Sequence, residues 1–239
     1  MIAILPAAGK GTRMSGLTAG GSKELLPVSG RPVFGWAVAE AEEALVDRIV
    51  AISSPDKEDL NEFLQNQPTK IETAMQFVPD GLAPAIALAG SHDSALVILP
   101  DTLFYPKMPS VRIARALSEG FDIVVLTERV DESAVSSYGI VEADANGGIL
   151  HLLEKPAPSA TKSRNAVAGR YGLSERMMEF LSEALYSLSD ENEEIALTPI
   201  LNLAIKNDFH AIALAVSPDE QRFDCGSPEG YRAACEAIQ

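Results

Sequence analysis

The chain has 239 residues, of which 46% are hydrophobic and 22% are charged, and its formal net charge is −15 at pH 7. This composition suits one globular domain with a full core and excludes a disordered or low-complexity chain. The acidic balance argues against nucleic acid and anionic membranes as partners, because both need a broad basic surface. The opening residues lack the pattern of a secretion signal, and no apolar run is long enough to cross a bilayer, so we expect a cytoplasmic protein.

Short apolar segments alternate with helical patterns through the first half of the chain. Residues 95–99 are almost purely aliphatic, which is typical of a central strand in a parallel sheet. Phe34, Ala37 and Ala41 recur at the spacing of one helix face. The strands predicted in chain order are 2–5, 48–52, 73–78, 95–99 and 123–126, and the helices predicted between them are 34–45, 55–64, 84–89 and 111–117.

The pattern changes after about residue 135, where strand-like segments follow one another with little helix between them. The earlier alternation is typical of β-α-β units. We therefore predict an α/β fold, with a single Rossmann-like domain over residues 1–239 and a mixed, mostly parallel central sheet flanked by helices. The later elements are predicted as strands 138–142, 149–154, 166–173 and 211–216, the last strand of the chain, and as helices 176–188, 198–206 and 228–237.

The first predicted strand runs into a glycine-rich turn, residues 7–14, with the sequence Ala-Ala-Gly-Lys-Gly-Thr-Arg-Met. A turn of this kind points backbone N–H groups where they can grip phosphates. The dinucleotide fingerprint would need a third glycine in place of Met14, and the P-loop would need Ser or Thr after Lys10. The turn therefore predicts phosphate binding of neither standard type.

Positive charge gathers beside this turn. Lys10, Arg13 and Lys23 all precede Glu24, which is the first acidic residue of a strongly acidic chain. A small polyanion is the natural ligand for such a group of cations.

At this point the sequence resembles the sugar-1-phosphate nucleotidyltransferases, and most of all the bacterial glucose-1-phosphate uridylyltransferases and thymidylyltransferases. The resemblance begins with Gly-Lys-Gly-Thr-Arg-Met at 9–14 and Lys-Glu-Leu-Leu-Pro-Val at 23–28. Further blocks follow in the family's order and cover nearly the whole chain. They lie at residues 76–83, 99–101, 138–142, 154–156, 169–171, 197–198 and 223–226.

This resemblance implies an enzyme of nucleotide sugar biosynthesis. It would transfer a nucleotidyl group from UTP or dTTP to a sugar 1-phosphate, with glucose 1-phosphate the expected acceptor, and release pyrophosphate. The implied cofactor is Mg²⁺, and the implied partners are these small substrates, with a homo-oligomer left open. Residues 1–135 would form the nucleotide-binding half and residues 136–239 the sugar-phosphate-binding half.

Three residues match the family's catalytic positions. Arg13 resembles its catalytic arginine, whose planar guanidinium can bridge two phosphate oxygens. Lys23 resembles the lysine that contacts the phosphates undergoing transfer. Asp101 follows the aliphatic strand 95–99 and so lies at the carboxyl end of a parallel strand, where ligands bind in such sheets. With Asp224, it resembles the carboxylate pair that holds Mg²⁺.

The remaining matches divide between the two substrates. Gln76 resembles a nucleobase contact, because a carboxamide offers a donor and an acceptor side by side. On the sugar side, Lys155 resembles the lysine that binds the 1-phosphate, and Glu154 resembles the acceptor for sugar hydroxyls. The implied nucleotide-binding set is Ala8, Gly9, Gly11, Thr12, Gln76 and Gly81, and the implied sugar-phosphate-binding set is Gly139, Glu154, Lys155 and Gly169.

The choice between UTP and dTTP stays open. The block at 79–83 resembles the thymidylyl type, whereas the blocks at Gly169 and 223–226 resemble the uridylyl type. Thr102 stands where thymidylyltransferases commonly have asparagine, and Ser22 stands where several members have proline.

The sequence leaves two alternative functions, a non-catalytic binding protein and an oxidoreductase. A non-catalytic nucleotide-sugar-binding or regulatory protein on the same fold would be expected to lack Arg13, Lys23 or Asp101, and all three are present. A nicotinamide-binding oxidoreductase is disfavoured by the missing third glycine and by the change of pattern after residue 135.

Overall fold

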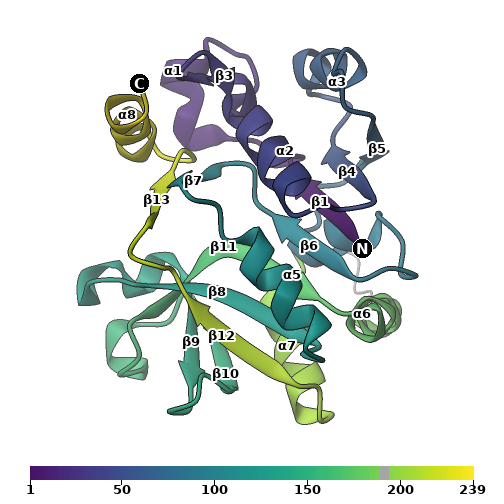
Figure 1. Ribbon diagram of the computed structural model, residues 1–239, viewed down its shortest axis with the longest axis vertical. Helices are drawn as coiled ribbons and strands as arrows, with labels where there is room; N and C mark the ends of the chain where they lie inside the picture. Colours follow the sequence, from purple (N-terminus) through teal and green to yellow (C-terminus); the bar gives the residue numbers. More distant parts are fainter. Residues whose placement is uncertain (189–193) are drawn as a thin grey trace.

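The computed structural model describes residues 1–188 and 194–239, and its centre is a nine-stranded mixed sheet with helices on both faces (Figure 1). Strands β10 and β11 run opposite to the other strands of this sheet, so the predicted fold class is confirmed. The sheet contains β1 (Ile2–Pro6), β4 (Arg48–Ser53), β5 (Ile71–Met75), β6 (Ala95–Ile98), β8 (Ile123–Arg129), β9 (Gly139–Ala143), β10 (Ile149–Glu154), β11 (Asn165–Leu173) and β12 (Ala211–Ala215).

The first half of the chain builds a parallel sheet in the order β6-β1-β4-β5. The carboxyl ends of these strands lie at the same edge, which places the turns that follow β1, β4 and β6 together. Strand β11 joins this sheet to the second half, because it pairs with β6 along one edge and with β8 along the other, antiparallel to both. Strands β9 and β10 then extend the sheet as an antiparallel pair.

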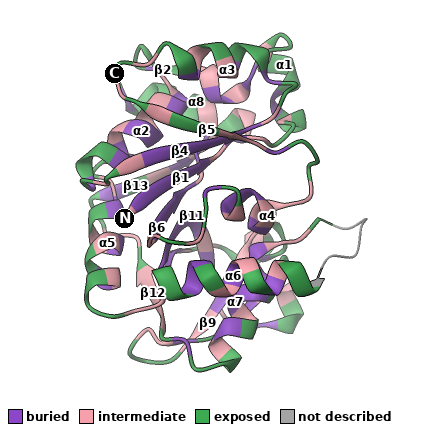
Figure 2. Cartoon of the chain, turned by 90° about the vertical axis from the view of Figure 1, so that its right-hand side faces the viewer, coloured by how far each residue is buried: buried purple, intermediate pink, exposed green. Residues whose placement is uncertain are grey.

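Side chains that alternate along each strand feed two separate cores. Ile2 and Ile4 pack under α4 (Leu82–Ala87), α6 (Glu175–Leu188) and α7 (Leu197–Lys206). Ala3 and Leu5 point to the opposite face, under α2 (Val33–Glu43), α3 (Glu58–Gln65) and α5 (Ser110–Ser118). Figure 2 shows the buried strands between these two helical layers. The period of two along β1 is therefore what fixes the three-layer arrangement.

A small third core joins the end of the chain to residues near its beginning. It packs α8 (Pro228–Ala237) on a two-stranded sheet of β7 (Thr102–Pro106) and β13 (Glu220–Asp224), beside the β2–β3 hairpin (Pro27–Val28, Arg31–Pro32). The short remaining helices are η1 (Thr12–Met14), α1 (Ser15–Thr18), η2 (Lys23–Leu25), η3 (Glu132–Ser137) and η4 (Pro158–Ala160).

The structure corrects two of the predicted strands. The predicted last strand, 211–216, is followed by β13, whose mostly polar sequence Glu-Gln-Arg-Phe-Asp lacks the apolar run of a central strand. Strand β5 ends at Met75 instead of continuing to Val78. Phe77 and Val78 are exposed, because the chain turns away from the sheet after Gln76 donates to the Ser53 carbonyl.

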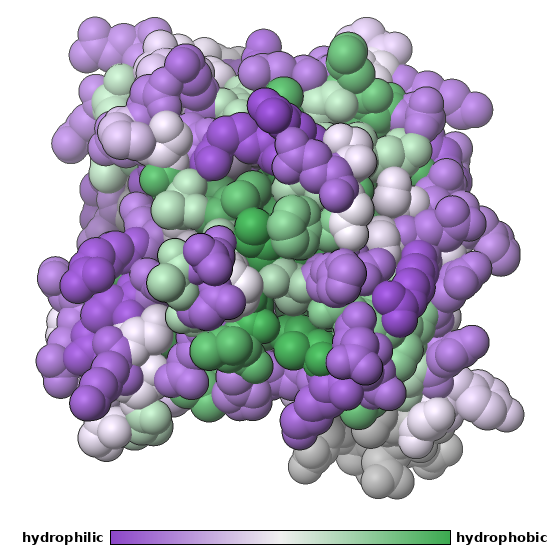
Figure 3. All heavy atoms as spheres, turned by 60° about the horizontal axis from the view of Figure 1, so that its bottom comes forward, coloured by the Kyte–Doolittle hydropathy of each residue, from purple (hydrophilic) through white to green (hydrophobic). Residues whose placement is uncertain are grey.

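Several large apolar side chains are exposed at the surface. Figure 3 shows a face with hydrophilic side chains around its rim and apolar side chains gathered near its middle. Leu45 and Leu150 are among the exposed large apolar residues. Single exposed apolar side chains such as these are normal in folded proteins and indicate no function by themselves. Within residues 1–188 and 194–239, no helix has the length and apolar character needed to span a membrane.

One buried ion pair joins the sheet to the helix layer. Arg170 on β11 is 1% exposed and forms a two-pronged pair with Glu40 of α2, which is 2% exposed. Its remaining N–H groups donate to the carbonyls of Leu99, Thr102 and Gly169, so every donor of the guanidinium has an acceptor. A lysine could not make this set of bonds, because it lacks the planar fork.

We expect Arg170→Met to lower the free energy of unfolding by about 3 to 5 kcal/mol, because Glu40 would remain buried without its partner. Urea denaturation measures the change. Arg115→Met is the matched control, since Arg115 pairs with Glu119 on the exposed face of α5 and its loss should cost about 0.5 kcal/mol or less. Equal losses in the two variants would contradict the buried role of Arg170.

Candidate active site

Three adjoining hollows lie along the carboxyl edge of the parallel strands, and together they form one elongated cleft. The outer hollow encloses about 350 Å³ beside the glycine-rich turn, the central hollow about 490 Å³, and the inner hollow about 270 Å³ beside β9 and β11. Lys23 and Gln76 line both the outer and the central hollow, while Asp101 and Leu99 line both the central and the inner hollow. The site residues inferred from the sequence all line this cleft. They are Ala8, Gly9, Gly11, Thr12, Arg13, Lys23, Gln76, Gly81, Asp101, Gly139, Glu154, Lys155, Gly169 and Asp224.

The glycine-rich turn is shaped by a left-handed residue and a buried anchor. Gly11 has φ of 61°, a conformation that glycine adopts without strain, and a Cβ there would lie 3.3 Å from the Lys23 side chain. Met14 is fully buried and fixes the end of the turn, where its N–H donates to the Gly11 carbonyl. A Cβ at Gly9 would meet no other atom within 4 Å, so the backbone here is open to the cleft.

Opposite charges meet at the centre of the cleft. The Lys23 ammonium lies 2.5 Å from Asp101 Oδ2. Burial alone would raise the pKa of Asp101, but the positive charges of Lys23, Arg13 and Arg170 outweigh it and hold the pKa below its ordinary value. Asp101 is therefore a carboxylate at neutral pH.

Gly226 marks the point where the charged groups converge. A Cβ on this glycine would lie 2.9 Å from Asp101 Oδ2, 3.1 Å from Asp224 Oδ1 and 3.3 Å from Arg13 Nη2. The Gly226 N–H also donates to Asp224 Oδ1. Two carboxylates and a guanidinium from three distant segments thus surround one small volume.

The turn that carries Asp101 is fixed from below. Asp101 follows the end of β6 after Leu99 and Pro100, at the carboxyl end of the strand as the sequence predicts. The buried Arg170 guanidinium binds the carbonyls of Leu99 and Thr102, which flank Pro100 and Asp101 on either side. These contacts explain how a turn at the edge of the sheet holds one geometry.

At the outer end of the cleft, the carboxamide of Gln76 is oriented by the protein. Its Nε2 donates to Asp80 Oδ1 at 2.6 Å and to the Gly81 carbonyl at 2.9 Å. Both partners are acceptors, so the nitrogen and oxygen of the amide are assigned without ambiguity. The sequence suggested that Gln76 offers a donor and an acceptor to a ligand, but its donor is occupied and the oxygen is the half left to face a ligand.

Gly81 has a structural reason for being glycine. Its φ is 115°, and a Cβ would collide with the backbone of Ile195, 2.7 Å from the Ile195 nitrogen and still closer to its carbonyl oxygen. Ile195 lies just before α7 and donates to the Asp80 carbonyl. The close approach therefore ties the Gln76 segment to the second half of the chain.

The inner end of the cleft gathers Gly139, Glu154 and Gly169, which are three of the four residues inferred for the sugar phosphate. Glu154 Oε2 accepts a hydrogen bond of 2.7 Å from Thr198 Oγ1, and a Cβ on Gly139 would face both of these groups. Gly169 has φ of 73°, and a Cβ there would lie 2.9 Å from Thr102 Oγ1. Glycine at both positions keeps this hollow open.

Lys155 extends toward the central hollow from the end of β10. Its side chain is 65% exposed, and its ammonium lies 3.9 Å from Glu154 Oε1. Glu154 lines the inner hollow, whereas Lys155 lines the central one. The adjacent side chains thus flank the junction between the two hollows.

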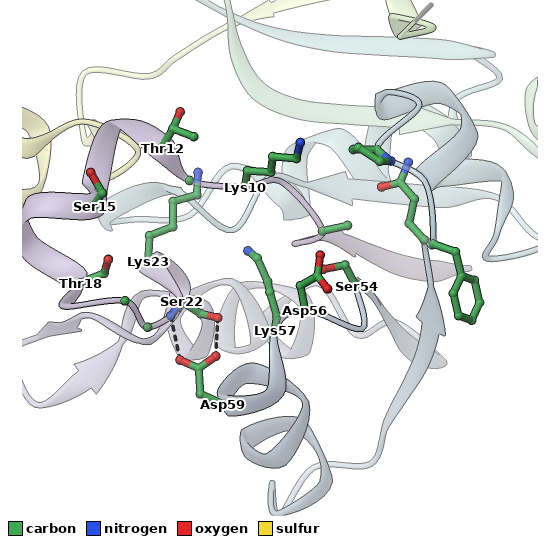
Figure 4. Close-up of a pocket in the computed structure, with 17 residues that line it drawn as sticks. Lys10, Thr12, Ser15, Thr18, Ser22, Lys23, Ser54, Asp56, Lys57 and Asp59 are labelled. Atoms are coloured by element: carbon green, nitrogen blue, oxygen red, sulfur yellow. Dashed lines mark hydrogen bonds between the residues drawn. The ribbon is translucent and has the colours of Figure 1, made fainter. Parts of the chain in front are cut away.

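Several residues that line the cleft were not predicted from the sequence as site residues. Thr198 falls in a block that resembles the family, so a signal for it was present. Arg222 lines the inner hollow and is held by Glu128 at 2.6 Å, over the ring of Tyr138, and no sequence signal marked it. Lys57 is also unmarked, although its ammonium shares the outer hollow with those of Lys10 and Lys23 (Figure 4).

Neither of the two cysteines lines the three hollows. Cys225 is buried next to Asp224, and burial raises the pKa of its thiol to about 12, so it stays neutral. Cys235 is exposed on α8.

Comparison with known proteins assigns the family. The family model described as nucleotidyl transferase matches residues 2–239. The chain belongs to this family. It is 30% identical to the UTP–glucose-1-phosphate uridylyltransferase of Mycoplasma genitalium, over 96% of this chain and 88% of that protein. It is also 30% identical to the glucose-1-phosphate thymidylyltransferase of Neisseria gonorrhoeae, over 81% of this chain and 68% of that protein.

The fold of this family member is also that of solved relatives. A UDP-glucose pyrophosphorylase solved in complex with UDP-glucose superposes with a TM-score of 0.86 and 29% identity. The match covers 99% of this chain and 97% of that structure. The mixed sheet and both of its halves are therefore common to the two proteins.

We expect Gly81→Ala to destabilise the protein more than Gly90→Ala does. Both glycines have positive φ, so each substitution carries about 1 to 2 kcal/mol of backbone strain, but only the Gly81 variant also collides with Ile195. A Cβ at Gly90 meets no atom within 4 Å. The extra cost should be about 1 to 3 kcal/mol in urea denaturation. Similar losses for the two variants would mean that the Gly81–Ile195 contact is dispensable.

Proposed function

We propose that this family member is an enzyme that transfers a uridylyl or thymidylyl group from UTP or dTTP to glucose 1-phosphate. The observation that carries the proposal is the convergence of Arg13, Lys23, Asp101 and Asp224 at the junction of the cleft. A nucleotide in the outer hollow and a sugar phosphate in the inner one would place their phosphates at this junction.

The proposed chemistry is an in-line displacement. A phosphate oxygen of the sugar phosphate forms a bond to the α-phosphorus of the triphosphate, the bond from that phosphorus to the β-phosphate oxygen breaks, and pyrophosphate leaves. Both reactants are anions, so neutralising and aligning them supplies most of the catalysis. Arg13 and Lys23 bring positive charge to the transferred phosphates, and no enzyme nucleophile is required.

The donor set at the junction fits Mg²⁺. Asp101 and Asp224 present carboxylate oxygens around one small volume, and Mg²⁺ in such enzymes takes one or two carboxylates together with substrate phosphates. Over residues 1–188 and 194–239, no cluster of three or more His, Cys, Asp and Glu could hold a metal without such help. Bound Mg²⁺ would screen the repulsion between the two phosphates.

Selection of a pyrimidine would rest on Gln76. With its Nε2 bound to Asp80 and Gly81, its oxygen is set to accept a hydrogen bond. Uracil and thymine carry an N3–H that can donate this bond, and cytosine does not. If the oxygen faces the N3 position, it favours UTP and dTTP over CTP, because cytosine N3 is itself an acceptor, and it does not separate UTP from dTTP.

The sugar phosphate would bind between Glu154 and Lys155. Glu154 is held by Thr198 and offers its other oxygen to sugar hydroxyls. Lys155 would pair with the 1-phosphate at the junction. These two residues suit a sugar 1-phosphate, and the relatives named for glucose 1-phosphate support that sugar as the acceptor.

Pyrophosphate release tests the proposal. The purified protein is incubated with Mg²⁺ and glucose 1-phosphate, and UTP, dTTP, CTP, ATP and GTP are compared in parallel. Release with UTP or dTTP alone supports the proposal, and the faster substrate names the activity. If none of the five triphosphates gives pyrophosphate release and calorimetry shows tight binding of UDP-glucose, a non-catalytic binding protein would be favoured.

We expect Asp101→Asn to lower kcat by at least about a hundredfold, the scale of losing one positioned electrostatic group. Thermal unfolding should show an intact fold, because the Asp101 turn is held through Arg170. Asp93→Asn, which changes a half-buried carboxylate whose ion pair in the described part of the chain is with Arg48, is the matched control and should retain wild-type turnover. Turnover near that of wild type in Asp101→Asn would remove Asp101 from the reaction.

We expect Lys155→Ala to raise KM for the sugar phosphate by about tenfold, the scale of one charge-assisted bond, and to leave KM for the triphosphate unchanged. Steady-state kinetics with each substrate varied in turn measures both values. Lys162→Ala serves as a control on a nearby exposed lysine. An equal rise in both KM values would place Lys155 on the nucleotide side.

A further inference from the structure

The segment that carries Lys23 is short and follows helix α1 and a loop of the small residues Ala19, Gly20 and Gly21. Lys23 begins the single turn η2, and residues 15–21 before it include glycine at positions 16, 20 and 21. Glycine leaves the backbone many conformations, so this loop cannot itself fix where Lys23 lies. The side chain has four rotatable bonds and is equally adaptable. The position of the ammonium must therefore depend on contacts that hold the backbone.

One such contact lies immediately before Lys23. The Asp59 carboxylate accepts a hydrogen bond of 2.7 Å from the Ser22 N–H and another of 2.6 Å from Ser22 Oγ, and Figure 4 shows both. Asp59 is in the first turn of α3, and it also accepts from the Leu60 N–H. Burial raises the pKa of Asp59, but the bonds from Ser22 outweigh it and hold the pKa below its ordinary value.

A second contact lies immediately after Lys23. Glu24 is buried, and its carboxylate lies 2.8 Å from the ammonium of Lys57, which is also buried. Lys57 and Asp59 are two residues apart at the start of α3. The residues on both sides of Lys23 are thus tied to the same short segment.

The two contacts leave the Lys23 side chain free to point into the cleft. Its ammonium reaches Asp101 on the opposite wall, 78 residues along the chain. In Figure 4, Lys23 extends into the outer hollow while Ser22 is held below it by Asp59. The segment is therefore held by the start of α3 on one side, and the Lys23 side chain points to Asp101 on the other side.

We propose that Asp59 is a positioning residue, which acts through Ser22 to hold Lys23 where it meets the transferred phosphates. The inference rests on the proposed function in that it takes Lys23 as a phosphate-binding group. Asp59 itself touches neither Lys23 nor Asp101 through any hydrogen bond or ion pair in the described residues.

The first test is Asp59→Ala. We expect kcat to fall by about ten- to a hundredfold, because a small misplacement of a catalytic group is enough for such a loss, while KM for the sugar phosphate changes less than about twofold. Glu58→Ala is the matched control, since it also removes an acidic residue from the first turn of α3 but makes no contact with the loop in the described bonds. It should retain wild-type kcat, which separates positioning from any effect of helix-end charge.

The second test is rescue by proline. Ser22 has φ of −72° and ψ of 128°, a backbone that proline adopts by its own ring. In an otherwise unchanged protein, the proline Cδ would replace the N–H that now lies against Asp59 Oδ2, so Ser22→Pro alone should clash and lower kcat. Combined with Asp59→Ala, the clash is gone and the ring fixes the backbone. We expect this double variant to recover kcat to within about threefold of wild type.

A third measurement needs no turnover. Hydrogen exchange of the amides of residues 23–26 and 28 should accelerate in Asp59→Ala and return toward the wild-type rate in the double variant, because exchange reports local opening of this segment. This measurement tests the role of Asp59 independently of whether the protein catalyses the proposed reaction. Absence of turnover in the wild-type protein would contradict the proposed function. The hydrogen-exchange rates of the three proteins would still show whether Asp59 holds the Lys23 segment.

Two outcomes would overturn the inference. One is an Asp59→Ala variant with wild-type kcat and unchanged exchange. The other is a double variant no better than Asp59→Ala in kcat and in exchange, although thermal unfolding shows it to be folded.

Discussion

The ion pair between Lys23 and Asp101 is the contact around which the cleft is organised. It joins the glycine-rich side of the site to the turn after β6, and Arg13 and Asp224 come within reach of the same point. Opposite charges placed this close need a rigid support, because the gain from an ion pair near water is small and is easily lost to side-chain freedom. The rest of the fold supplies that support from both walls.

On one wall the support is a fully bonded guanidinium. Arg170 uses all of its donors on Glu40 and on backbone carbonyls, and two of those carbonyls flank Asp101. On the other wall, Asp59 and Lys57 hold the residues next to Lys23. Polar contacts that lie outside the junction of the cleft thus define where Lys23 and Asp101 lie.

Much of this arrangement could be predicted from the sequence. The aliphatic run of β6 and the spacing of α2 predict a layered α/β fold, and the position of Asp101 after β6 predicts its place at the carboxyl edge. Strand β13 was missed because a polar strand in a two-stranded sheet has no apolar period. Arg170, Glu40 and Asp59 could not be recognised as supports, because their partners lie 130 and 37 residues away and a lone charged residue is normally a surface residue.

A crystal structure of the protein grown with UDP-glucose and Mg²⁺ would test most directly whether the cleft binds a nucleotide sugar and the metal ion. We expect Mg²⁺ to be bound by Asp101 and Asp224, with the diphosphate beside Lys23 and Lys155. The uracil N3–H should point to the Gln76 oxygen, and the glucose hydroxyls should lie at Glu154. A nucleotide sugar bound outside the cleft, or Mg²⁺ bound without either aspartate, would contradict it.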